Sequence, residues 1–582
     1  MITIQFGDLK SHLLAGLIVL ILLIFNRKLS LQKFDFWYLG FLGCFILATI
    51  FSETPYGFKE FATFFIGFAV YLLAKNITSR QSKSLAIPFV ILVGLLSAVS
   101  VTKFLISPVD RLDGFFIGYP NVMATWLLLV IPILVYLYFQ YSFQQERFQK
   151  VATTFSLVFS VTAFILTFAR GPLLAGFVMI GLGLGIYAVF KANIKQFMAK
   201  LFLFSFFIFA ATGLTYLIQE TKTYSLDVSD RLISSDISSA KSVNERLIFF
   251  KNSASIFMYS QKNILLGIGP GSFQFIHPKW QTESFSNSEH PHNLFLKIFL
   301  EAGLCAGIFF LAWLFSILIS VFKTLLESPV KNKLNLTLGV ALIGFFVASL
   351  VDYNLGFVPI YILVFGYLGY LVQDSSSPKF IINSKLKNIV AGLLVLLFLL
   401  QGFFFFKAET ESTAAPFLYK AIPFKQDLDL LNRNLSVLQY LSQRYPNLHT
   451  VNYQLAKSDL LIAPGKKTDL LIQAINLNPY NNFEYYIALF KTAPLEISQN
   501  YYNQAAGILA KYNGLLAINA HLTVISDTPF FANQLYKLLP KSPELKKQYK
   551  EFQTILFAEG VKFDTRYQTE LFNKFKSWNY NY

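Results

Sequence analysis

Long apolar runs, separated by short polar stretches, fill the chain up to about residue 406. A bilayer core about 30 Å thick needs about 20 apolar residues per helix. Runs bounded by charged residues, Gly or Pro predict about twelve transmembrane helices, at 13–25, 36–51, 58–74, 85–106, 119–141, 151–168, 172–190, 201–218, 294–322, 334–350, 355–372 and 389–406. The first run lacks a small-residue cleavage site and precedes further runs, so we expect it to remain as a membrane anchor.

From residue 409 onward the long apolar runs stop and amphipathic helical patterns replace them. A shift of 33 residues, close to the roughly 34-residue tetratricopeptide period, relates two triplets in this part: Pro446, Tyr453 and Ala456, and Pro479, Tyr486 and Leu489. The pattern predicts an all-α protein with a polytopic membrane domain over 1–408 and a helical, tetratricopeptide-like domain over 409–582. Stacked helix pairs can bind a protein partner, but a helical cap without a ligand explains the pattern equally well.

The composition excludes an ordinary soluble domain. Hydrophobic residues make up 54% of the 582 residues, charged residues only 14%, and the mean hydropathy is +0.51. A soluble fold of this size cannot hide so much apolar surface, so lipid must be part of its surroundings. The net charge of +17 would suit nucleic acid or another anionic partner, so the positions of the charges must decide between them.

Lys and Arg residues are distributed unevenly between the two sides of the predicted spans. Connections after the odd-numbered spans each carry two or three of them, whereas the opposite short connections hold only Lys59, Arg111 and Arg170. An excess of positive residues marks the cytoplasmic side. We therefore expect the long loop 219–291 and the chain after Phe406 to be extracytoplasmic, and we expect no nucleic acid partner.

Arg111 and Arg170 stand on the side where positive residues are scarce, so each needs its own explanation. Arg170 lies in a tight turn between two spans, where an ionisable side chain usually faces a cavity or an anionic partner. The alternative is an interfacial anchor whose charged head reaches the lipid head groups. For Arg111 the structural alternative is stronger, because Asp110 and Asp113 can pair with it at the surface.

The long outer loop 219–291 contains a candidate helix. Ser242 and Glu245 have the spacing of a capping box, which predicts that a helix begins at Ser242. Arg246 then lies four residues before Phe250, so the two side chains share one face of that helix. We expect Arg246 to point toward whatever this apolar face covers.

A glycine-rich stretch follows at residues 267–272 of the same loop. No strand, turn and helix unit surrounds it, so the dinucleotide-binding interpretation fails and a tight loop is expected. A loop whose backbone amides cradle a phosphate is the alternative.

The outer loop ends directly before the apolar run 294–322, at His290, His292 and Asn293. Ten residues separate His292 from Gly303, and Glu301 lies two residues before that glycine. This spacing, at the outer mouth of a predicted helix and after two arginine-bearing segments, resembles the histidine pattern of the O-antigen ligase and polymerase family. The resemblance covers about residues 111–371.

Members of that family transfer a glycan from an undecaprenyl diphosphate carrier to an acceptor on the outer face of the bacterial cytoplasmic membrane. The resemblance implies the same donor here, with membrane lipids around it and a glycan, lipid or protein as acceptor. It also implies roles for matching residues: Arg170 and Arg246 would hold the diphosphate, His292 would be the base, and the supporting substrate-binding candidates are Arg111, His290, Asn293 and Asp352.

The chemistry of these side chains agrees with the implied roles. Arg offers forked donors that stay charged, so two arginines can meet the growing charge on a leaving diphosphate in place of a metal. A histidine titrates in the range needed to take the proton from an attacking hydroxyl. We therefore expect a metal-independent enzyme without a cofactor, and a single-step displacement would invert the anomeric carbon.

Several functions remain open at this level. A ligase acting on lipid A core, a polymerase joining repeat units and a protein glycosyltransferase share this chemistry and differ in acceptor. A lipid-linked glycan flippase or another polytopic transporter is the main alternative, and it predicts internal repeats with interrupted helices, which the sequence does not show. A scaffold protein that is anchored by its membrane region is the third possible function.

Overall fold

The computed structural model describes a large part of the chain, namely residues 12, 14–19, 22, 30–54, 57–77, 79–106, 111–114, 118–142, 144–189, 209, 211–213, 215, 237–282, 288–327, 333–373, 379–381, 428–457, 463–480 and 483–509. These residues are mostly helical, which confirms the predicted class. The chain divides into two compact units: Met1–Phe273 with Glu289–Lys407, and Gln274–Ser288 with Ala408–Tyr582.

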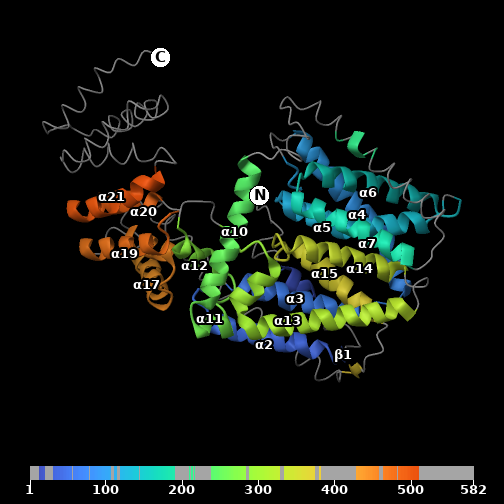
Figure 1. Ribbon diagram of the computed structural model, residues 1–582, viewed down its shortest axis with the longest axis horizontal. Coiled ribbons are helices and arrows are strands. Elements are labelled where there is room, and N and C mark those ends of the chain that lie inside the picture. The colour runs from blue at the N-terminus through green and yellow to red at the C-terminus, as the bar shows by residue number, and fades with distance from the viewer. Residues whose placement is uncertain are drawn as a thin grey trace, which may run out of the picture. The chain divides into compact units, whose positions relative to one another are not determined.

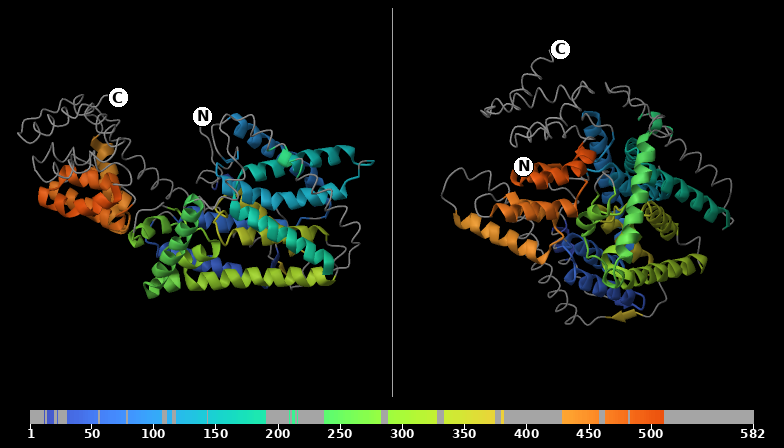
Figure 2. Two further views of the ribbon diagram at one scale, coloured as in Figure 1. Left: turned by 45° about the horizontal axis from the view of Figure 1, so that its top comes forward. Right: turned by 60° about the vertical axis from the view of Figure 1, so that its left-hand side comes forward.

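The first unit is a bundle of long helices (Figure 1). The described helices are α2 (Asp35–Ile50), α3 (Phe58–Ala74), α4 (Ser79–Ile106), α5 (Pro120–Gln140), α6 (Arg147–Leu166), α7 (Arg170–Val189), α10 (Ile237–Met258), α11 (Gln261–Leu266), α13 (Leu294–Glu327), α14 (Lys333–Ala348) and α15 (Val358–Leu371). Helix α4 packs along α6, α2 along α13 and α3 along α15, while α14 contacts both α5 and α7. Figure 2 shows the bundle from two further directions.

Aromatic rings fill the space where α2, α3, α13 and α15 meet. Tyr38 lies at the centre, with its ring centroid 4.5 Å from that of Trp313 and 4.6 Å from that of Phe68. Its hydroxyl donates to the Phe64 carbonyl at 2.8 Å, so the polar end of the buried ring is satisfied. Large apolar rings packed around a satisfied hydroxyl hold these four helices together.

One end of the bundle is closed by a short sheet and a buried ion pair. Strand β1 (Ser30–Gln32) pairs antiparallel with β2 (Lys379–Ile381), with Leu31 opposite Phe380. Nearby, Asp35 accepts hydrogen bonds from Lys75 and Tyr71, each at 2.6 Å. Apart from Tyr71, which lies near the end of α3, these residues come from connections that the charge pattern assigns to the cytoplasmic side, and they meet at one end of the bundle.

Four described helical stretches are long and apolar enough to cross a membrane: Ser84–Ile106, Pro120–Gln140, Arg147–Leu166 and Leu294–Lys323. Shorter apolar helices occupy Asp35–Ile50, Arg170–Gly183, Lys333–Ala348 and Val358–Leu371. The predicted spans 201–218 and 389–406 fall mainly outside the described residues, and span 13–25 is described only in part. The total of about twelve spans therefore stays a prediction.

The second unit contains α17 (Leu428–Arg444), α18 (His449–Lys457), α19 (Pro464–Leu477), α20 (Phe483–Thr492) and α21 (Leu495–Leu509). Each helix packs against the next one along the chain. The two residues that end the repeated triplets, Ala456 of α18 and Leu489 of α20, are both buried. This arrangement suits a stack of helix pairs, and the tetratricopeptide assignment stays a prediction.

The same unit includes a piece of the outer loop. The 3₁₀ turn η1 (His277–Trp280) follows α12 (Phe273–Ile276) and packs on α19. The ring of Phe275 lies 6.2 Å from that of His449 on α18, and His277 is fully buried. Loop segment Gln274–Ser288 is therefore grouped with the second unit, and Phe275 and His277 pack within it.

Candidate active site

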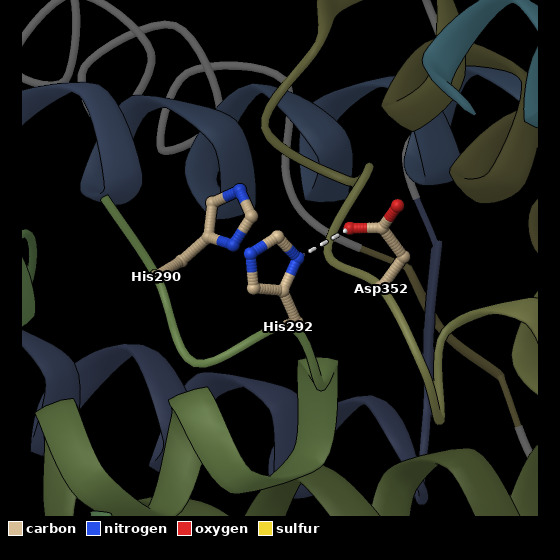
Figure 3. Close-up of side chains that lie close together, drawn as sticks. All are labelled: His290, His292 and Asp352. Atoms are coloured by element: carbon tan, nitrogen blue, oxygen red, sulfur yellow. Dashed lines mark hydrogen bonds and ion pairs between the residues drawn. The ribbon is translucent and has the colours of Figure 1, made fainter. Parts of the chain in front are cut away.

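His292 and Asp352 form the centre of the candidate site. The Nδ1 atom of His292 lies 3.1 Å from the Oδ1 atom of Asp352, although 60 residues separate them in sequence. His292 lies two residues before Leu294, the first residue of α13, and Asp352 lies in the turn between α14 and α15. Figure 3 shows His292 between His290 and Asp352, with the two imidazoles beside each other and their ring centroids 4.7 Å apart.

The chain around His292 explains how the pair is held. Asn293 caps α13, because its Oδ1 atom accepts the Leu296 N–H at 2.9 Å, and its Nδ2 atom donates to the Leu350 carbonyl at 2.9 Å. His292 itself has a φ of 52°, in the left-handed region that residues other than Gly seldom adopt. Such strain persists only where the surroundings enforce it, and it gathers at functional sites.

Asn121 links the pair of His292 and Asp352 to Arg111 through hydrogen bonds. The Asn121 amide donates from Nδ2 to the Oδ2 atom of Asp352 at 2.9 Å, and its Oδ1 atom accepts from Arg111 at 2.8 Å. The surface pairing considered for Arg111 does not involve Asp113, which pairs with Lys103 at 2.9 Å. Asp110 lies outside the described residues. Arg111, Asn121, Asp352 and His292 thus form one hydrogen-bonded series.

Arg170 begins α7 directly after the tight turn expected from the sequence. Phe168 in that turn has a φ of 48°, and the Thr167 carbonyl accepts the Nε–H of Arg111 at 2.9 Å. A cation at the first position of a helix opposes the helix dipole, so Arg170 is not there to stabilise α7. Its side chain is exposed, and it lies three residues after Thr167, whose carbonyl Arg111 contacts.

Helix α10 places Arg246 near the carboxylate of Asp352, whose pKa it helps to lower. The predicted start of this helix at Ser242 is wrong: α10 begins at Ile237, so Ser242 lies inside the helix and cannot cap it. The buried face also differs by one residue from the expected one. Phe249, Ser253 and Ile256 are buried, whereas Phe250 is only half-buried.

The ionisation of the central residues suits a base. Although burial alone would raise it, the hydrogen bond from His292 and the nearby positive groups hold the pKa of Asp352 well below its usual value. Burial, together with the neighbouring His292, lowers the pKa of His290 to about 3. Asp352 is therefore a carboxylate and His290 a neutral imidazole at neutral pH.

A buried charged cluster lies next to His290, and the sequence interpretation did not assign it a place in the site. The His290 ring lies 5.1 Å from that of Tyr353, whose hydroxyl donates to Glu60. Lys297 pairs with Glu60 at 3.4 Å and with Glu301 at 2.8 Å. The sequence did carry a signal for this cluster, because Glu60, Lys297 and Glu301 lie inside predicted spans. Ionisable residues are costly in a membrane and usually have a function there.

The glycine-rich stretch forms a tight loop, as expected, but it does not present a phosphate cradle. The N–H groups of Ile268 and Gly269 donate to the carbonyls of residues 300 and 301, each at 3.0 Å. The Gly271 N–H donates to the Glu301 carboxylate at 3.0 Å. These amides already have partners, and a buried carboxylate beside them would repel a phosphate.

The histidines and Asp352 can also be considered as metal ligands. One ligand atom each from His290, His292 and Asp352 lie within 4.8 Å of one another. However, Asp352 already accepts from His292, Asn121 and its own neighbouring amide, that of Tyr353 at 2.8 Å. In this arrangement Asp352 orients the His292 ring as a carboxylate orients a catalytic base, and the same three side chains could hold a metal ion only with a rearrangement of the bond between Nδ1 and Oδ1 if that nitrogen were the ligand.

Residues 155–311 match the family described as O-antigen ligase. The chain carries an O-antigen ligase domain. This confirms the resemblance inferred from His292 and Gly303, both of which lie within the matched residues. No curated protein and no solved structure matches the chain.

The match supports a membrane protein of surface polysaccharide assembly, and the family suggests a glycosyltransferase-type enzyme that acts on a lipid-linked glycan. The domain contains Arg170, Arg246, His290 and His292. Arg111, Asn121 and Asp352 lie outside the matched residues, and the fold brings them to the domain through the contacts described above.

Proposed function

We propose that this O-antigen ligase-like protein transfers a glycan from undecaprenyl diphosphate to an acceptor on the outer face of the bacterial cytoplasmic membrane. The observation that carries the proposal is the His292 and Asp352 pair, whose Nδ1 and Oδ1 atoms lie 3.1 Å apart at the start of α13. The pair belongs to the O-antigen ligase domain through His292 and lies at the end of the bundle where Arg111 and Arg170 occur.

His292 is the proposed base. Because Asp352 accepts the Nδ1 proton, the Nε2 atom is the one that takes the proton from the acceptor hydroxyl. His290 stands beside this ring with a pKa of about 3, so it is a neutral imidazole and not an imidazolium at neutral pH. Asp352 stabilises the imidazolium that forms, in the way a buried carboxylate orients a catalytic histidine.

The arginines are the proposed clamps on the leaving group. As the acceptor oxygen bonds to the anomeric carbon, the bond from that carbon to the diphosphate oxygen breaks and its electron pair stays with the diphosphate. Arg170 and Arg246 would meet this charge with forked donors, while Arg111 and Asn293 would help to bind substrate. Attack from the side opposite the leaving group would invert the sugar.

The helical second unit is proposed to lie on the same side of the membrane as His292. Loop segment Gln274–Ser288 belongs to that unit and leads directly, along the chain, into the segment that carries His290 and His292. A domain built around this segment must share its side of the bilayer. A helical stack there supports docking of a protein partner or a synthesis complex.

The test is glycan transfer by purified protein in nanodiscs, from an undecaprenyl diphosphate oligosaccharide, with lipid, glycan and protein acceptors offered separately. We expect one acceptor to be used by the wild type and by His449→Gln, a histidine variant in the other unit, but not by His292→Ala. The acceptor then distinguishes ligase, polymerase and protein glycosylation. If nothing is transferred while the carrier crosses the bilayer, the transporter alternative holds.

Metal independence is tested in the same assay. Activity in excess EDTA should equal activity in its absence, since arginines rather than a cation are proposed to hold the diphosphate. Loss of activity in EDTA and recovery with Mn²⁺ would instead make His290, His292 and Asp352 metal ligands.

A further inference from the structure

We infer that Phe249 is a positioning residue for His292, which rests on the role proposed for His292 as base. The Phe249 ring stacks on the imidazole with a centroid distance of 5.6 Å and an angle of 28° between the planes. Phe249 is 2% exposed and makes this contact from α10, more than 40 residues before His292. The sequence had pointed to Phe250, whose side chain lies on a different part of the helix.

The stack supplies a restraint that the hydrogen bond lacks. The bond from Nδ1 to Asp352 fixes one atom of the His292 ring, and by itself it does not fix the plane of the ring. A ring stacked on the imidazole face fixes the plane. Together the two contacts aim Nε2 in one direction, which a base must keep to within about 0.5 Å and 10–20°.

Phe249 is itself held from behind by Phe273. The two rings meet edge to face, with centroids 6.3 Å apart, and Phe273 is fully buried. Phe273 directly follows the glycine-rich loop 267–272. The position of this loop therefore decides where Phe273 and then Phe249 lie.

The loop is fastened to a kink in α13. Gly303 has a φ of 85° inside that helix, and a Cβ atom there would come within 2.2 Å of the Leu265 carbonyl oxygen. The kink interrupts the helical ladder, so the carbonyls of Leu300 and Glu301 can accept the N–H groups of Ile268 and Gly269. The Glu301 carboxylate also accepts the Gly271 N–H. Gly303, the glycine of the family's pattern, therefore allows loop 267–272 to pack against α13.

Helix α10 also carries Arg246, one turn before Phe249. The proposed diphosphate clamp and the residue that orients the base are therefore parts of one rigid element. A shift of α10 that weakens the clamp also releases the imidazole plane, which links donor binding to the readiness of the base.

The experiment compares Phe249→Leu, Phe249→Tyr and Phe250→Leu, using the full chain in nanodiscs. Phe249→Leu should lower kcat by about tenfold and leave KM for the lipid-linked donor unchanged, since only the aim of the base is lost. Phe249→Tyr keeps the ring and should stay within about twofold of wild type. Phe250→Leu is the matched control on the same helix and should behave as wild type.

A second measurement does not depend on transfer. In protein labelled with ¹³C at histidine Cε1, the His292 signal is the one missing from His292→Ala. Phe249→Leu should shift it, because the ring current of the stacked phenyl is lost, whereas Phe250→Leu should not. An unmoved signal, or an unchanged kcat with Phe249→Leu when His292→Ala is inactive, would overturn the positioning role; a wild type that transfers nothing would overturn the proposed function instead.

Discussion

The two ends of the helix bundle each hold a cluster of charged side chains, and the clusters are built differently. At one end, Asp35 accepts from Lys75, Tyr71 and the Gln32 amide, and the side chains of Lys75 and Asp35 are 2% and 0% exposed. At the other end, the side chain of His292 is 26% exposed and its backbone is in the left-handed region.

The difference separates charges that hold the fold from charges that await a ligand. Both carboxylate oxygens of Asp35 accept short hydrogen bonds from the protein itself, and the side chains of Asp35 and Lys75 are not accessible to a ligand. Around His292 the supporting carboxylate is buried while the imidazole reaches the surface, with exposed Arg170 and half-buried Arg111 and Arg246 at the same end. A site that acts on an anionic carrier needs this combination of a fixed support and accessible donors.

The largest expected effect separates the two ends directly. His292→Ala should lower kcat by about 10²–10⁴-fold, because that is the range contributed by a positioned base. The amount of folded protein in the membrane should stay normal, measured by size-exclusion chromatography in detergent. A variant that transfers glycan as well as wild type would remove His292 from the chemistry.

A smaller effect is expected at the arginines and tests the forked clamp. Arg170→Lys should retain charge but lose the paired donors, lowering kcat by about 10–100-fold. Arg147 begins α6 with an exposed side chain, as Arg170 begins α7, so Arg147→Lys is the matched control and should be unaffected. Full activity of Arg170→Lys would mean that a point charge suffices.

The opposite end should respond in stability rather than activity. Asp35→Asn leaves Lys75 buried with a neutral partner, and breaking a buried pair in this way typically costs about 3–5 kcal/mol. The apparent Tm in detergent should fall, while kcat per folded molecule should remain that of wild type. If Asp35→Asn instead lowered kcat at an unchanged Tm, the Asp35 end would take part in catalysis and the two ends would not differ in role.

The smallest effect extends the comparison to the second unit. Burial lowers the pKa of His449 from its ordinary 6.5 to about 4, so as the pH falls the unfolded state takes up the proton first. The free energy of unfolding of this unit should be constant above about pH 6.5 and decrease by about 3 kcal/mol down to about pH 4. Hydrogen exchange of α18 and α19 amides in the full chain measures this, and His449→Gln should reduce the decrease.

Sequence reasoning located helices well and their neighbours poorly. An apolar run is a local pattern, so α3 was predicted to the residue and most other described helices to within a few residues. The start of α10 was misplaced because a capping box also fits inside a helix whose preceding residues continue it. The family was recognised from the spacing of His292, Glu301 and Gly303 in one short stretch, together with the two arginine-bearing segments that precede it.

The polar contacts of the site were harder to predict. Asn121 contacts Asp352 across 231 residues, and Tyr353 contacts Glu60 across 293. No local pattern encodes such pairs, and without the fold Asn121 is an ordinary residue after a helix-starting Pro120. Lys297 and Glu301 did carry a local signal, as charges within a predicted span, and their spacing of four residues predicts the ion pair that forms.

The left-handed backbone at His292 sets folding and catalysis against each other at one position. Holding a residue other than Gly there costs about 1–3 kcal/mol, and His292→Gly would remove that strain together with the imidazole. A library of variants sorted only for abundance in the membrane should therefore enrich His292→Gly, whereas sorting for surface glycan should eliminate it. Chains that drift free of selection for transfer would lose this histidine early and gain stability by doing so.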